Sequence, residues 1–138
     1  MPVASGYSGT PLARKLGIKE GMRVSAVDAP TEYQRWLAPL PPGVVFDAEP
    51  GAHSALVHLF TDRAQVLRER LTTWRASLAP SCPVWVSWPK KAAKVPTDIT
   101  EDVIRASALP AGWVDIKVCA VSDVWSGLKL VLRTSLRR

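Results

Sequence analysis

The sequence predicts a three-layer α/β domain with a mostly parallel sheet and an antiparallel hairpin at its C-terminal end. Segments typical of strands alternate with segments typical of amphipathic helices over most of the chain, which is the order that builds parallel sheets through right-handed crossovers. Residues 55–60, Ala-Leu-Val-His-Leu-Phe, are almost continuously apolar, as in a strand buried on both faces. Residues 113–132 have the pattern of two strands around a turn.

Length and composition fit one ordinary globular domain. The chain has 138 residues, of which 47% are hydrophobic and 22% are charged. We expect a loose arm over residues 1–9, a single α/β domain over 10–134 and a basic tail over 135–138. The 18 Lys and Arg residues exceed the 12 acidic ones, which gives a net charge of +6. This excess favours an anionic partner, although a basic surface also serves solubility.

Helix starts, helix stops and apolar runs define the first half of the domain. Pro11 is tolerated at a first helical position, Gly17 is a C-terminal stop, and three prolines at 39, 41 and 42 end the next helix. We expect, in chain order, a helix over 11–17, a strand over 22–27, a helix over 31–38, and strands over 44–46 and 55–60.

The second half contains the longest helix and the hairpin. Thr61 and Asp62 are expected to cap a helix whose leucines recur at helical spacing, and Pro89 is expected to end the following strand. Leu109 is expected to point inward near the end of the next helix. The predicted spans are a helix over 63–78, a strand over 83–88, a helix over 100–109, and strands over 113–121 and 128–132, joined by a turn over 122–127.

A ligand site is predicted at the carboxyl ends of the parallel strands, where open α/β sheets bind their ligands. Lys90, Lys91 and Lys94 follow one such end and precede a helix start, so this loop is a candidate anion site. Trp88 could stack on a flat ligand. The expected ligand-binding residues are Asp28, Ala29, Pro30, Phe60, Trp88, Lys90 and Lys91.

Other site classes lack their signatures. Cys82 and Cys119 are too far apart for a disulfide scaffold and are expected to be buried thiols. His53 and His58 have no metal-ligand spacing, and His58 is expected to be a hydrogen-bonded core residue, so no metal is predicted. Neither a Gly-x-Ser-x-Gly elbow nor a phosphate loop is present. With neither a signal peptide nor an apolar run long enough to span a bilayer, we expect a cytoplasmic protein without membrane contact.

The predicted architecture resembles the Rossmann-like fold of class I methyltransferases that use S-adenosylmethionine, in a trimmed form. Asp47 follows the second strand about 20 residues beyond Asp28, which is where such folds place an acid on the cofactor ribose. The resemblance therefore implies Asp47 as a cofactor-binding residue. The sequence departs from the family after the first strand, where Val27-Asp28-Ala29-Pro30 replaces a glycine-rich turn. From this departure we expect the cofactor site to be lost and no cofactor to be bound.

Four phrases also make the chain similar to a family of small bacterial proteins that carry a domain of unknown function. The phrases are Gly-Tyr-Ser-Gly-Thr-Pro-Leu-Ala at 6–13, Trp-Val-Ser-Trp-Pro-Lys-Lys at 85–91, Pro-Thr-Asp-Ile-Thr-Glu at 96–101 and Val-Trp-Ser-Gly-Leu at 124–128. The resemblance implies a fold and a bacterial origin, and it brings no activity.

The leading functional prediction is a non-catalytic binding or regulatory module rather than an enzyme. Its ligand would be a small anionic or nucleotide-like molecule, or an acidic segment of a partner protein. One alternative is a degenerate S-adenosylmethionine-dependent methyltransferase. A second is a nucleic-acid-binding protein, which is less expected because the arginines are scattered and no nucleic-acid-binding motif occurs. A homodimer could cover the exposed hairpin edge.

Overall fold

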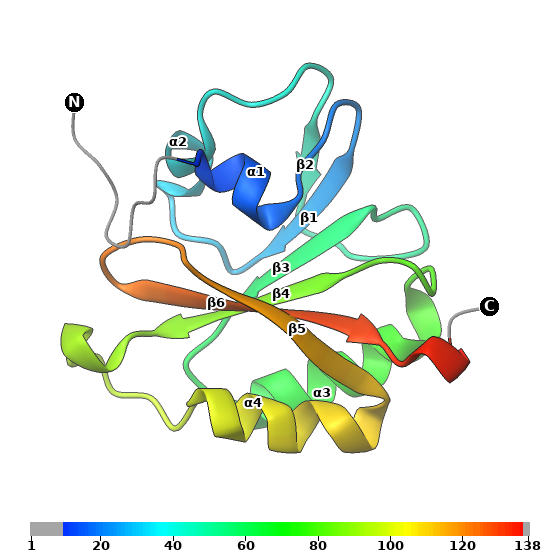
Figure 1. Ribbon diagram of the computed structural model, residues 1–138, viewed down its shortest axis with the longest axis vertical. Coiled ribbons are helices and arrows are strands. Elements are labelled where there is room, and N and C mark those ends of the chain that lie inside the picture. The colour runs from blue at the N-terminus through cyan, green and yellow to red at the C-terminus, as the bar shows by residue number, and fades with distance from the viewer. Residues whose placement is uncertain (1–9, 137–138) are drawn as a thin grey trace.

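The computed structural model describes residues 10–136, which form one six-stranded sheet between two layers of helices (Figure 1). The predicted arm at 1–9 and the last two residues of the predicted tail lie outside the described residues. The strands are β1 (Arg23–Val27), β2 (Val45–Asp47), β3 (Leu56–Phe60), β4 (Val84–Pro89), β5 (Trp113–Ala120) and β6 (Trp125–Leu132). The helices are α1 (Leu12–Leu16), α2 (Tyr33–Leu37), α3 (Ala64–Ser77) and α4 (Glu101–Ala108), with short 3₁₀ turns η1 (Lys91–Ala93), η2 (Leu109–Ala111) and η3 (Thr134–Leu136).

The sheet is mixed, with the order β2-β1-β3-β4-β6-β5. β2, β1, β3 and β4 are parallel, and β6 runs antiparallel to both of its neighbours, β4 and β5. The predicted α/β class, with a mostly parallel sheet and an antiparallel C-terminal pair, is confirmed. The hairpin strand β6, and not β5, lies against the parallel part of the sheet, so β5 is an edge strand.

Two apolar cores lie on the two faces of the sheet. α3 and α4 cover one face, where Leu67, Leu71 and Ile104 pack on alternate residues of β3 and β4. α1 and α2 cover the other face, where Leu16 and Leu37 are fully buried. β3 and β4 are buried along their whole length, as the continuous apolar run predicted for β3.

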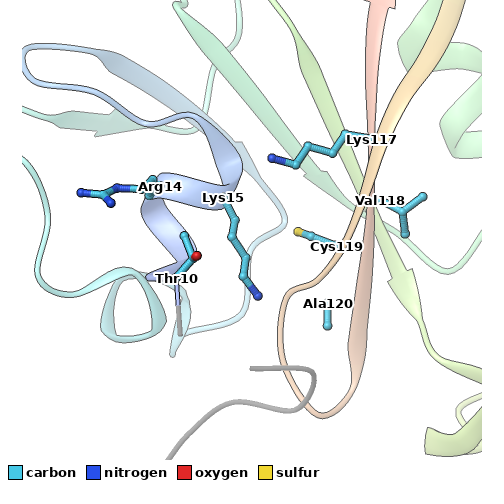
Figure 2. A pocket seen from close by; sticks show the side chains of 7 residues that line it. All are labelled: Thr10, Arg14, Lys15, Lys117, Val118, Cys119 and Ala120. Atoms are coloured by element: carbon cyan, nitrogen blue, oxygen red, sulfur yellow. The ribbon is translucent and has the colours of Figure 1, made fainter. Parts of the chain in front are cut away.

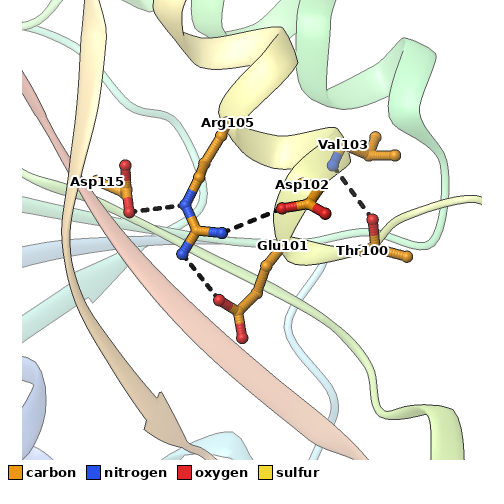
Figure 3. Close-up of polar contacts among 6 residues, drawn as sticks. All are labelled: Thr100, Glu101, Asp102, Val103, Arg105 and Asp115. Carbon is orange, nitrogen blue, oxygen red and sulfur yellow. Dashed lines mark hydrogen bonds and ion pairs between the residues drawn. The ribbon is translucent and has the colours of Figure 1, made fainter.

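A charged cluster joins α4 to the edge strand (Figure 3). Arg105 Nε donates to Asp115 Oδ2 of β5 at 2.9 Å, and its terminal nitrogens pair with Glu101 and Asp102 at 2.8 and 3.4 Å. These contacts hold the pKa of Arg105 above its usual value, chiefly through the hydrogen bonds to Asp115 and Glu101. Thr100 caps the same helix by accepting from Val103 N at 3.2 Å. The edge strand is thereby tied to the helical layer.

Three local predictions are wrong. The α3 N-terminus takes its capping acceptor from Asp98, whose Oδ1 accepts from Ala64 N at 2.7 Å, and not from Asp62. Leu109 is 49% exposed because the chain leaves α4 there for η2. β6 begins at Trp125, because Val121 N and Ser122 N both donate to Trp125 O and close a tighter turn than the six residues expected.

None of the described helices is both long and apolar enough to cross a membrane.

Candidate functional site

The chain changes direction across the sheet between β1 and β3. β2 lies on one side of β1 and β3 on the other, so the loops after β1 and β3 lead to opposite layers, to α2 and to α3. In open α/β sheets, ligands bind at the carboxyl ends of the strands at such a switch point. In this protein the two loops start at Asp28 and at Thr61.

Asp28 forms the turn that leaves β1. Its φ is +57°, in the left-handed region, and it is exposed. Among residues with a side chain, Asp and Asn tolerate this region best. Pro30 follows, half-buried, and its carbonyl accepts from Tyr33 N at 3.0 Å to start α2. The backbone therefore makes a tight turn at the predicted position without glycine.

The two aromatic residues predicted to contact a ligand, Phe60 and Trp88, do not lie together. Phe60 is 2% exposed and belongs to the core under α1 and α2, where it stacks on His58 with ring centroids 4.3 Å apart. Trp88 is 7% exposed and belongs to the core under α3 and α4. The two side chains lie on opposite faces of the sheet. In this conformation both contribute to packing.

The loop that carries Lys90, Lys91 and Lys94, called the lysine loop below, follows the carboxyl end of β4. Lys90 N donates to Val124 O at 2.7 Å, which fixes the start of the loop against the β5–β6 turn. Lys91 is exposed and begins η1, and Lys94 ends η1 in a left-handed conformation with φ +56°. Asp98 and Thr97 of the same loop bind backbone groups at the start of α3. The loop thus connects β4 to α3 and α4 and places Lys91 toward solvent.

Asp47 lies at the end of β2, beside Ser25 of β1. Its carboxylate accepts from Ser25 Oγ at 2.7 Å and pairs with Arg23 Nη1 at 3.2 Å and His53 Nε2 at 3.4 Å. Burial alone would raise the pKa of Asp47, but the hydrogen bonds from Ser25 and Arg23 and the charge of His53 lower it below its usual value. The carboxylate is therefore ionised and held by residues of β1 and of the loop before β3.

A buried polar network, of which the sequence predicted only His58, joins α2, β3 and β4. Tyr33 Oη lies 2.8 Å from His58 Nδ1, and His58 Nε2 lies 2.7 Å from Ser87 Oγ. Burial lowers the pKa of His58 to about 3 and raises that of Tyr33, so both are neutral at pH 7. His58 and Ser87 are completely inaccessible to solvent, which leaves no route for a substrate to this hydroxyl. His58 is the hydrogen-bonded core residue that was predicted.

A pocket of about 560 Å³, also missed by the sequence reasoning, lies between α1 and β5 (Figure 2). Cationic residues line both of its walls, and Cys119, half-buried rather than buried as predicted, lines one. Lys15 and Lys117 were the available signal, but only the packing of α1 beside β5 brings them together. The lining residues are Thr10, Arg14, Lys15, Lys117, Val118, Cys119 and Ala120.

Among the described residues, no group of three or more His, Cys, Asp or Glu side chains could hold a metal ion.

Comparison with solved structures shows the fold. The chain is similar to a SAM dependent methyltransferase from Aquifex aeolicus, with a TM-score of 0.62 and 14% identity over 88% of both chains. It is also similar to the Methanococcus jannaschii fibrillarin pre-rRNA processing protein (TM-score 0.54, 5% identity, 91% of this chain and 70% of that one). A third is the W203A mutant of the 16S rRNA (adenine(1408)-N(1))-methyltransferase from Catenulisporales acidiphilia (TM-score 0.51, 15% identity, 94% and 96%). No protein-family model and no curated protein matches the sequence.

These similarities correct the leading functional prediction. A non-catalytic binding or regulatory module was expected because the glycine-rich turn is missing after β1. The solved proteins that share the architecture over nearly their whole length include S-adenosylmethionine-dependent methyltransferases, which favours the methyltransferase alternative. The physical reason for the error lies at Asp28, since a left-handed aspartate makes the turn that the reasoning reserved for glycine.

Proposed function

We propose that this protein is an S-adenosylmethionine-dependent methyltransferase that acts on a nucleic acid. The observation that carries the proposal is the sheet, with its switch point between β1 and β3 and its antiparallel β6 between β4 and β5, a fold shared with such methyltransferases over nearly the whole chain. Two of the similar structures bear names that refer to rRNA, and the net charge of +6 suits a polyanionic acceptor.

The residues at the switch point suit the cofactor in part. The Asp28 carboxylate is exposed at the end of β1, where it would accept a hydrogen bond from the cofactor's ammonium group. Asp47 is ionised, as an acceptor of ribose hydroxyls should be, but it would have to exchange Arg23 or His53 for the ribose. The bound cofactor would supply an electrophilic methyl group on its sulfonium. Phe60 and Trp88 would support the site from the core without touching the cofactor.

The direct test is calorimetric titration of the full chain with S-adenosylmethionine and S-adenosylhomocysteine, with a thermal-shift assay alongside. At a concentration about 100 times the dissociation constant, either compound should add about 2.7 kcal/mol to the free energy of unfolding. Asp28→Asn keeps a residue that tolerates the left-handed turn and removes the charge, so it should weaken binding about tenfold. Asp47→Asn should also weaken binding, whereas Glu49→Gln, an exposed neighbour, should not.

Methyl transfer is then measured as formation of S-adenosylhomocysteine with and without total RNA. RNA-dependent product supports both halves of the proposal. If neither adenosyl compound binds the wild-type protein, the cofactor assignment is wrong. If both bind and no product forms with RNA, the acceptor class is wrong.

A further inference from the structure

The pocket between α1 and β5 has lysines on both of its walls. In Figure 2, Lys117 and Cys119 point from β5 toward α1, and Lys15 extends from α1 into the space between them. Val118 points away from the pocket, and the Arg14 guanidinium is directed away from β5. Lys117 and the hydroxyl of Thr10 are hydrogen-bond donors that the walls offer to a ligand.

A second lysine, Lys129, lies beside Lys117 on the neighbouring strand. Lys129 of β6 is in register with Lys117 of β5, so the two side chains project from the same face of the hairpin. The Lys129 ammonium lies against the C-terminal end of α1, since a methyl group placed on Gly17 would be 3.6 Å from Lys129 Nζ. Burial, followed by the charges of Lys117 and Lys19, lowers the pKa of Lys129.

Within residues 10–136, no ion pair joins Lys117 or Lys129 to a carboxylate. Like charges placed directly opposite each other on neighbouring strands destabilise a sheet. The hairpin thus retains an unfavourable pair of cations at the edge of a cavity, where a bound anion would relieve the repulsion.

The wall that faces β5 is firmly built. α1 is anchored by Leu16, which is fully buried, and by Trp85 of β4, whose Nε1 donates to Leu16 O at 2.8 Å. A pre-formed wall lowers the cost of ordering the site when a ligand binds. The volume of about 560 Å³ falls within the range of pockets that hold small organic ligands and is more than one phosphate needs.

We propose that a phosphoryl anion binds at the end of this pocket where Lys117 lies. Its principal cations are Lys117, which lines the pocket, and Lys129, the cross-strand neighbour of Lys117. β5 runs in the same direction as β4, so Ala120 lies toward the same edge of the sheet as the switch point. Four strand spacings separate β5 from β1, which is about 19 Å. The phosphate of an acceptor nucleic acid could therefore be held here, apart from the cofactor. This role rests on the proposed function, whereas anion binding itself does not.

The test is calorimetric titration of the full chain, at low salt and without adenosyl compounds, with pyrophosphate and with a single-stranded RNA of about ten nucleotides. Lys117→Gln and Lys129→Gln should each weaken pyrophosphate binding about tenfold. Arg68→Gln is the matched control, because it removes one positive charge from an exposed position on α3, across the sheet. The affinity of Arg68→Gln for pyrophosphate should stay within about twofold of that of the wild type.

If RNA binds more tightly than pyrophosphate and the same substitutions weaken RNA binding, the ligand is a nucleic-acid phosphate. Pyrophosphate that binds at least as tightly as RNA identifies a small phosphorylated molecule. The site is refuted if the wild type binds neither probe, if both lysine variants bind like the wild type, or if Arg68→Gln loses as much affinity as they do. Because these titrations contain no adenosyl compound, their failure is separate from a failure of the cofactor assignment.

Discussion

Asp28 determines whether the first turn of the switch point can form. A left-handed conformation costs a β-branched residue about 1–2 kcal/mol and costs glycine almost nothing. We expect Asp28→Gly to change the free energy of unfolding by less than about 0.5 kcal/mol and Asp28→Val to lower it by about 1–2 kcal/mol, both measured by urea denaturation. Asp123→Val is the control, since this exposed turn residue has an ordinary φ. An equal loss in Asp123→Val would mean that valine in a turn, and not the left-handed backbone, is responsible.

The conformation of Asp28 could not be predicted from the sequence. The absence of glycine after β1 is visible in the sequence, and the inference that a close backbone turn needs glycine is sound for most residues. Aspartate is one of the few side chains that tolerate the left-handed region, and the sequence does not reveal which residue of a turn will occupy it. The prediction of a lost cofactor site rested on the missing glycine, both for the tight turn and for the close approach of the backbone to a ligand. The conformation of Asp28 answers the first reason, and the second stays a prediction.

At the scale of elements, the order of helices and strands was predictable and their lateral contacts were not. Pro11, Gly17 and the continuous apolar run of β3 act locally, and the elements they delimit are where the sequence placed them. Which face a side chain occupies depends on register between strands far apart in the chain. Phe60 is paired with Ser87, so Phe60 and Trp88 fall on opposite faces of the sheet, which their places in the sequence did not reveal.

The β5–β6 hairpin contains the clearest conflict between elements. In a buffer without multivalent anions, Lys117→Gln should raise the free energy of unfolding by a few tenths of a kcal/mol, because it removes the repulsion with Lys129. Salt screens such a partly exposed pair, so the gain should shrink as the ionic strength rises toward 1 M. Urea denaturation at low and high salt measures both effects. A loss of stability at low salt would show that Lys117 has a stabilising partner, which contradicts the repulsion.

At the scale of the whole molecule, the Tyr33–His58–Ser87 network links three elements from both sides of the switch point. Tyr33 comes from α2, His58 from β3 and Ser87 from β4, and each hydroxyl is satisfied by one nitrogen of the ring. A neutral imidazole has one donor and one acceptor nitrogen, which matches two hydroxyls. A protonated ring would have two donor nitrogens and a buried charge that no solvent stabilises. Folding therefore requires His58 to be neutral.

This requirement predicts acid sensitivity of the entire fold. The pKa of His58 is about 3 in the folded protein against 6.5 in the unfolded chain, so the unfolded state binds the extra proton between these values. The contribution of His58 to stability is complete above pH 6.5 and falls as the pH is lowered toward 3. Between pH 7 and pH 5 the free energy of unfolding should drop by about 2 kcal/mol. Urea denaturation of His58→Gln should show a flat profile over this interval. An equally steep fall in His58→Gln would place the acid-sensitive group elsewhere.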